Sequence, residues 1–221
     1  FLAGKVVSEA CFSTTSSQSN TTTLCPNGQS TQLGAGAAAP CVGICSHGTH
    51  VAGIAAGNGA GSTGVAKDAT ILAIQVFSRF NSASSCPNGP PCLRAFTSDI
   101  VAGLDRVYDL RSTFSIASAN MSLGGGRFTS PCDSGSAYKG AIDLLRGAGI
   151  ATVIASGNDG FTDAIGSPGC VSTAVTVGST TKSDTVSSFS NSASFLDLLA
   201  PGSSIVSSVP GTGFANFNGT S

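Results

Sequence analysis

Residues 150–160 read IATVIASGNDG, and this stretch decides the fold class of the chain. Residues 150–155 form a continuous apolar run of strand length, and residues 156–160 have the composition of a tight turn. A strand that is apolar at every position, rather than at alternate positions, is typical of a parallel sheet buried on both faces. The stretch therefore predicts an inner strand that ends in a turn carrying Asn158.

Helical and strand patterns alternate on both sides of this strand. The spacing of apolar side chains predicts helices over residues 98–111, with Ser98 as N-cap, and over residues 134–147, ended by Gly147 or Gly149. Further strands are expected at residues 6–7, 71–77, 116–123 and 174–177. Strands that alternate with helices predict an α/β fold in which one mostly parallel sheet lies between helices.

The composition restricts the functions that the chain can have. It has 221 residues, a net charge of −1 and only 10% charged residues, so it offers no basic surface for nucleic acid. No apolar run reaches the roughly 18 residues that a membrane span needs, and residues 1–5 lack the pattern of a signal peptide. With 41% hydrophobic residues, the chain is expected to form one globular, monomeric domain.

The eight cysteines indicate disulfides and an oxidising compartment, and hence a secreted protein. Loops are expected at residues 13–40 and 81–91, and both contain or border cysteines that can anchor them. Cys41 and Cys45 lie beside His47 and His50, but their spacing is not that of a zinc finger. We therefore favour disulfides over a zinc site.

Six short motifs follow one another along nearly the whole chain. They are SHGTHVAGIAAG at residues 46–57, NMSLGG at 120–125, ASGNDG at 155–160, SFSN at 188–191, LAPG at 199–202 and NGTS at 218–221. Together they resemble the subtilisin-like serine proteases (subtilases), in particular the secreted bacterial and proteinase-K-like branches. The resemblance implies a three-layer αβα fold and a secreted endopeptidase that acts on protein or peptide substrates.

The same resemblance implies the catalytic residues. Ser221 corresponds to the nucleophile, and His47 to the general base that takes its proton and returns it to the leaving amine. Asn158 corresponds to the side-chain donor of the oxyanion hole. His50 is expected to be structural.

Two segments are implied to bind the substrate backbone and to line the pocket before the cleaved bond: Ser122, Leu123 and Gly124 in the first, and Ala155, Ser156 and Gly157 in the second. On the facing substrate strand the family usually has a small Ser-Gly pair. This chain has Arg94, Ala95 and Phe96 near there, so its distal subsites are expected to differ in shape.

Cysteine pairs and a metal site are implied as well. In a subtilase fold Cys132 and Cys170 lie near one sheet edge and are expected to pair, and Cys86 and Cys92 are expected to close their own loop. The other four cysteines allow three pairings, among which the sequence does not choose. No cofactor is expected for the chemistry. A structural calcium ion is expected on Asp197, with carbonyl groups near Ser172 and Ala174.

The catalytic acid of the family has no match. The family order is Asp, His, Ser, and Glu9 is the only acid before His47. It is not expected to substitute, because it would have to move to another strand. We expect residues 1–221 to be an incomplete catalytic domain that lacks the Asp strand and the helix after Ser221, and that is inactive and poorly folded by itself.

Two other functions remain open. A non-catalytic, disulfide-stapled binding module of subtilase ancestry would also lack the Asp. A serine esterase is less favoured, because its Ser would precede its His in the chain, whereas here His47 precedes Ser221.

Overall fold

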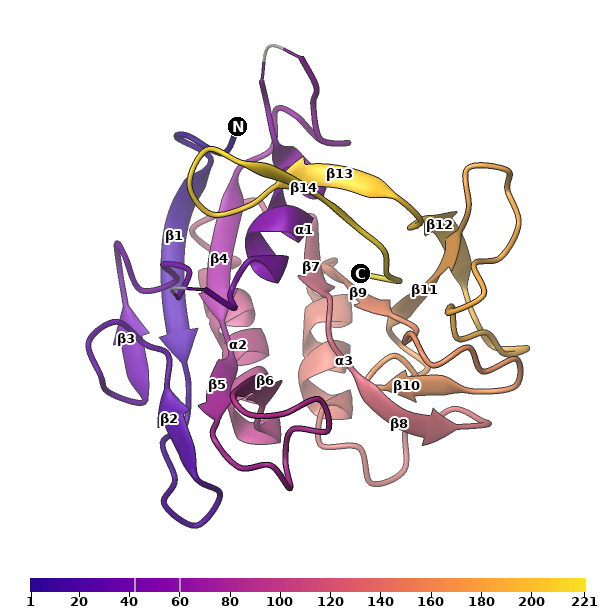
Figure 1. Ribbon diagram of the computed structural model, residues 1–221, viewed down its shortest axis with the longest axis horizontal. Helices are drawn as coiled ribbons and strands as arrows, with labels where there is room; N and C mark the ends of the chain where they lie inside the picture. The colour runs from indigo at the N-terminus through magenta and orange to yellow at the C-terminus, as the bar shows by residue number, and fades with distance from the viewer. Residues whose placement is uncertain (42, 60) are drawn as a thin grey trace. The chain divides into compact units, whose positions relative to one another are not determined.

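The computed structural model describes residues 1–41, 43–59 and 61–221. The chain forms two units, and the colour bar of Figure 1 lets the residues of each be followed by number. The first unit contains residues 1–106 and 208–213, and the second contains residues 107–207 and 214–221. Within the described residues, no helix is both long enough and apolar enough to cross a bilayer.

A four-stranded parallel sheet forms the centre of the second unit (Figure 1, pink to orange). Its strand order is β12 (Leu198–Pro201), β11 (Val175–Thr180), β9 (Ala151–Ala155) and β7 (Ser118–Met121). Met121 pairs with Ile154, so β7 and β9 end at the same edge of the sheet. The strand predicted at residues 150–155 is therefore an inner one, and the α/β class is confirmed.

Helix α3 (Lys139–Gly147) packs against β9 and supplies much of the core of this unit. Ile142 and Leu145 of the helix are fully buried, as are Ile154 of β9 and Ile165 of β10. Each such side chain contributes about 1.5–3 kcal/mol of burial free energy. Two further two-stranded sheets lie wholly or mainly in this unit: β8 (Gly125–Phe128) with β10 (Ile165–Ser167), which are antiparallel, and β13 (Ile205–Ser208) with β14 (Phe214–Phe217).

The first unit contains two three-stranded sheets and helix α1 (His47–Ala56). One sheet has the order β3 (Thr31–Leu33), β1 (Val6–Phe12), β4 (Ile71–Gln75), and the other β2 (Thr21–Thr23), β5 (Phe77–Phe80), β6 (Cys92–Ala95). Helix α2 (Thr97–Leu110) begins in this unit. β1 and β4 are parallel, and the other pairs are antiparallel.

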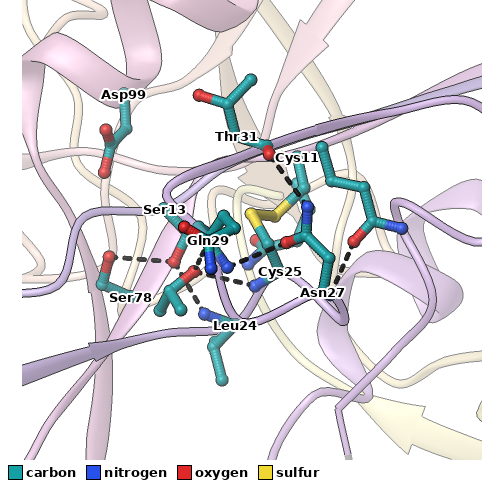
Figure 2. Close-up of a disulfide and its surroundings, with 12 residues drawn as sticks. Cys11, Ser13, Leu24, Cys25, Asn27, Gln29, Thr31, Ser78 and Asp99 are labelled. Carbon is teal, nitrogen blue, oxygen red and sulfur yellow. Dashed lines mark hydrogen bonds between the residues drawn. A yellow bond between two sulfur atoms is a disulfide. The ribbon is translucent and has the colours of Figure 1, made fainter.

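A disulfide and buried hydroxyl groups hold the segment after β1 in place (Figure 2). The disulfide joins Cys11 to Cys25, and both cysteines are buried. Beside it, the Ser13 hydroxyl donates to the Phe77 carbonyl at 2.8 Å and accepts the Leu24 N–H at 2.8 Å. These bonds satisfy polar groups that would otherwise be costly to bury.

Several predicted boundaries differ from the structure. The strand predicted at residues 71–77 is divided at Val76 between β4 and β5, and the loop predicted at residues 13–40 contains β2 and β3. The second predicted helix begins at Lys139 rather than at residue 134, because Gly135 has a φ of +79° and interrupts a helical path. Ser98 lies inside α2 and is not its N-cap.

Candidate active site

The turn after β9 places Asn158 at the surface of the second unit. Gly157 has a φ of +111°, which residues with a side chain rarely adopt, and a Cβ at this position would collide with the amide of Asn191. The strand therefore turns sharply after Ser156, and the next side chain points outward from the carboxyl edge of the sheet.

Asn191 holds this turn in place by hydrogen bonds. It is fully buried, and its side-chain oxygen accepts the N–H groups of Asp159 at 2.9 Å and Phe161 at 3.1 Å. Its amide nitrogen donates to the Ser156 carbonyl and to the Asp159 carboxylate, both at 3.2 Å. Its own N–H donates to the Gly157 carbonyl at 2.9 Å. One buried amide thus satisfies polar groups on both sides of Asn158.

The residue before Ser221 sets the orientation of the Asn158 amide. The Thr220 N–H and hydroxyl both donate to Oδ1 of Asn158, at 2.9 and 3.0 Å, and the Thr220 hydroxyl also accepts the Gly157 N–H at 3.2 Å. Two donors on Oδ1 identify that atom as the oxygen, so the other end of the amide is the NH₂ group. Among the described residues this NH₂ group has no acceptor.

The chain before Ser221 is held by a close crossing of two backbone segments. The Gly219 N–H donates to the Gly202 carbonyl at 2.9 Å, and Asn218 accepts the Ser204 N–H at 2.7 Å. A Cβ on Gly202 would collide with the Gly219 carbonyl oxygen. The motifs at residues 199–202 and 218–221 are therefore parts of one structural arrangement.

The two predicted substrate-binding segments lie at the same sheet edge. Residues 122–124 follow β7 and residues 155–157 end and follow β9, and these strands are neighbours. A Cβ on Gly124 would lie 4.0 Å from the Ala155 carbonyl oxygen and 3.0 Å from that of Ser167. Ser156 is buried and its hydroxyl donates to the Asn191 carbonyl at 2.8 Å, so its hydroxyl is committed to the fold.

His47 is the first residue of α1 and belongs to the first unit. It reaches the surface, but the protein around its ring removes part of its hydration. This desolvation, and secondarily the charge of His50, lowers the pKa of His47 below its ordinary value of 6.5. A neutral imidazole is the form that accepts a proton. His50 itself is buried, in keeping with the structural role expected for it.

Glu9 is committed to another task. Its carboxylate accepts the Gly36 N–H, and its carbonyl accepts the N–H of Gly34. These bonds fix the turn after β3. Within the described part of the first unit, His47 has no carboxylate partner.

Asp197 lies beside the start of β11. Its Oδ2 accepts the Thr176 N–H at 2.8 Å, and the residue is exposed. The N–H and hydroxyl of Ser172 instead donate to Asp133, at 2.8 and 2.5 Å. No cluster of three or more His, Cys, Asp or Glu side chains suited to a metal occurs among the described residues. A cation on Asp197 would therefore depend on backbone carbonyl groups, which suit a hard ion.

The cysteines form four disulfides, and none is free. The two expected pairs, Cys132–Cys170 and Cys86–Cys92, are present. The pairings that the sequence left open are Cys11–Cys25 and Cys41–Cys45. The last pair leaves no thiolate for a zinc ion next to His47.

Sequence reasoning missed the residues that hold the site. Asn191, Thr220 and Gly202 each belong to a motif in the chain, but none of these motifs carries a periodicity or charge pattern that reveals its partner. Their contacts join residues 17 to 63 positions apart. The only local feature of the sequence there is an Asn in a Ser-rich segment (residues 187–192), and it does not indicate the partners of Asn191.

Comparisons with known proteins agree with this architecture. The model of the subtilase family matches residues 42–221. Alkaline serine exoprotease A of Vibrio alginolyticus is 39% identical over 175 residues, which are 79% of this chain and 28% of that protein. Subtilisin-like protease 3 of Trichophyton tonsurans is 38% identical over 178 residues, which are 79% of this chain and 39% of that protein. The chain belongs to the subtilase family.

Solved structures place the fold in the same group. A cold-adapted subtilisin-like serine proteinase is similar with a TM-score of 0.59 and 40% identity, covering 79% of this chain and 55% of that one. The prenylagaramide maturation protease PagA has a TM-score of 0.64 at 24% identity over 79% of this chain and 58% of that one, a likeness of fold alone. The chain spans well under half the length of the two curated relatives.

Proposed function

We propose that the protein is a secreted serine endopeptidase that cleaves protein or peptide substrates through an acyl-enzyme on Ser221. The observation that carries the proposal is the orientation of Asn158. Its oxygen is occupied by two donors from Thr220, and its NH₂ group is left to donate beside Ser221. An oriented amide donor next to a serine is what the oxyanion of a tetrahedral intermediate requires.

In the proposed reaction, the Ser221 oxygen attacks the scissile carbonyl carbon and its proton passes to His47. The carbonyl oxygen becomes an oxyanion that accepts a hydrogen bond from Asn158. When the C–N bond breaks, His47 gives the proton to the leaving amine, and the acyl group stays on Ser221. Water then repeats the sequence, with His47 taking its proton, and releases the acid. The substrate backbone is proposed to lie along residues 122–124 and 155–157.

Secretion is supported by the cysteines. All eight are paired, and disulfides persist in oxidising compartments outside the cytosol. Free thiols would be expected in a cytosolic protein.

Labelling by a serine-directed fluorophosphonate tests the proposal in the intact protein. We expect peptide mapping to find the label on Ser221, and we expect His47→Ala to reduce both labelling and peptide hydrolysis by on the order of 10⁴–10⁶-fold. Thr97→Ser, which lies outside the proposed site, serves as the matched control and should label normally. No labelling of either protein would favour a non-catalytic module, and equal labelling of Ser221 in His47→Ala and the parent protein would contradict the role of His47 as general base.

We also propose a structural calcium ion on Asp197. Oδ2 is engaged by Thr176, which leaves Oδ1 for a cation, with carbonyl groups near Ser172 and Ala174 as further ligands. Chelation with EGTA is expected to lower the Tm of the intact protein, and Asp197→Asn is expected to remove this dependence on calcium. An unchanged Tm after chelation would contradict the proposal.

A further inference from the structure

The first turn of α1 lacks the groups that usually stabilise a helix start. Ser46 occupies the N-cap position with φ −84° and ψ −24°, which is helical, and its side chain makes no capping hydrogen bond. The first turn contains no acidic residue. Among the described residues, the N–H groups of His47, Gly48 and Thr49 have no acceptor. Side-chain caps and acidic residues are the ordinary remedies for such unpaired groups.

The other end of the same helix is well anchored. The carbonyl groups of Ile54 and Ala55 accept the N–H groups of Val65 and Ala66, at 2.9 and 2.8 Å. Gly48 and Gly53 lower the intrinsic helix propensity of this ten-residue helix. Fraying is therefore expected at the end where His47 lies, unless something else holds it.

A disulfide lies where the cap is missing. Cys45, two residues before His47, is joined to Cys41 across a sequence separation of only 4, with Gly43 at a φ of +90° in the loop. Val42 lies outside the described residues. The stabilisation that a disulfide gives by restricting the unfolded chain grows with loop length. This pair closes the shortest loop of the four, so its main effect is local.

We propose that the Cys41–Cys45 disulfide is a positioning element for His47, in that it fixes the backbone entering α1 and thereby the imidazole on the first helical residue. The inference rests on the proposed function for the role of His47 in proton transfer. It gives these two cysteines a task beyond the small stabilisation expected from so short a disulfide loop.

The pKa of His47 reports directly on this placement. It is lowered by desolvation of the ring and by the nearby charge of His50. A first turn that frays moves the ring into water and away from His50, and both changes return the pKa upward toward 6.5. Loss of global stability alone leaves the folded-state pKa where it was.

The experiment compares two disulfide deletions in the intact protein. Cys41→Ser/Cys45→Ser removes the proposed positioning element. Cys86→Ser/Cys92→Ser removes another short-loop disulfide, of sequence separation 6, whose second cysteine is the first residue of β6. The pKa of His47 is followed by NMR titration, with its signal assigned by loss in His47→Ala. Peptide hydrolysis gives kcat and KM for the same samples.

For the first variant we expect a higher pKa of His47 and a kcat lowered about 10- to 100-fold with little change in KM, since small misplacements of a catalytic group cost this much. For the control we expect neither change. An unchanged pKa in the first variant, or the same rise in both variants, would overturn the proposal.

Native reduction provides the test if the first variant does not fold. Cys11, Cys25, Cys86 and Cys170 are buried, so each of the other three disulfides has at least one protected sulfur, whereas Cys41 and Cys45 are only half-buried. A mild reductant with iodoacetamide should therefore modify Cys41 and Cys45 first, and peptide mapping verifies this. The pKa of His47 should then rise. A modified protein with the original pKa would contradict the proposal, and because this readout needs no activity, it is separable from failure of Ser221 to react.

Discussion

Asn158 and His47 are held in place in different ways. Asn158 lies in a turn that is hydrogen-bonded to residues 32 and 62 positions further along the chain. His47 begins a helix whose first N–H groups have no acceptor among the described residues, and a disulfide of sequence separation 4 precedes this helix. The turn is held by many weak, directional contacts, each of which orients one group. The helix start is held by one covalent bond between near neighbours. The first arrangement needs a complete unit around it, and the second needs only the local chain.

This comparison predicts graded losses around Asn158. The largest is expected for Asn158→Leu, which removes the proposed oxyanion donor while keeping a similar volume. Loss of one such donor costs about 10²–10³-fold in kcat, and KM should change little because the donor acts on charge that develops in the transition state. Steady-state hydrolysis of a peptide substrate measures both. A rise in KM of the same size, with kcat nearly unchanged, would argue for ground-state binding instead.

The next largest effect is expected on stability, for Asn191→Ala. The change removes a buried side chain that makes four hydrogen bonds and leaves their partners unpaired, so the free energy of unfolding should fall by about 2–4 kcal/mol. Asn120→Ala, at an exposed position with one side-chain bond to Ser122, is the matched control and should cost less than about 1 kcal/mol. Denaturant unfolding measures both, and equal losses would show that the turn is held by other contacts.

A smaller effect is expected for Thr220→Val, which removes the hydroxyl on Asn158 but leaves the amide donor. One of the two bonds that orient the amide is lost, so kcat should fall about tenfold, equivalent to about 1.4 kcal/mol. Thr220→Ser keeps the hydroxyl and should remain within about twofold of the parent by the same arithmetic. If Thr220→Val lost as much kcat as Asn158→Leu, the orientation of the amide would be as important to catalysis as the hydrogen bond that it donates.

The smallest effect concerns pH and the helix start. His47 acts as a base only when neutral, and its pKa is lowered below 6.5, so kcat/KM should fall only when the pH drops below that value. His50→Gln removes the neighbouring like charge and should move the midpoint upward. The pH profiles of both proteins measure this. A parent midpoint above 7 would show that a carboxylate outside the described part of the first unit stabilises the charged form of His47.

The parts of the fold that the sequence predicted are those set by local periodicity. The strand at residues 150–155 and the helical spacing of Ile100 and Leu104 are visible in any short window, and both occur in the structure. β2 and β3 were missed because their Thr and Gln residues have no apolar pattern. They are strands only because each pairs with a strand that is distant in the sequence: β2 with β5, and β3 with β1.

The candidate site shows the same division. Asn158 and Ser221 belong to short motifs that can be recognised in the sequence. The groups that hold their segments, such as Asn191 and Gly202, come into contact with them only in the folded chain. Nothing near Asn191 in the sequence indicates that it bonds to residues 156–161, because that contact is a property of two loops and not of either one. The pairing of Cys41 with Cys45 was likewise one of three equivalent choices until the structure placed the other cysteines.

The crossing of Gly202 and Gly219 has a consequence for how this chain tolerates sequence change. A Cβ on Gly202 strikes backbone, so variation there is removed because the protein does not fold. A Cβ on Gly219 meets nothing closer than 3.5 Å, but it would lie 3.8 Å from both the amide nitrogen of Asn158 and the Cβ of Ser221, where the proposed oxyanion would bind. We expect variants at that position to fold and to lose the proposed activity. The two glycines, which one hydrogen bond joins, would then be under different selection: Gly202 for folding, and Gly219 for the proposed catalysis.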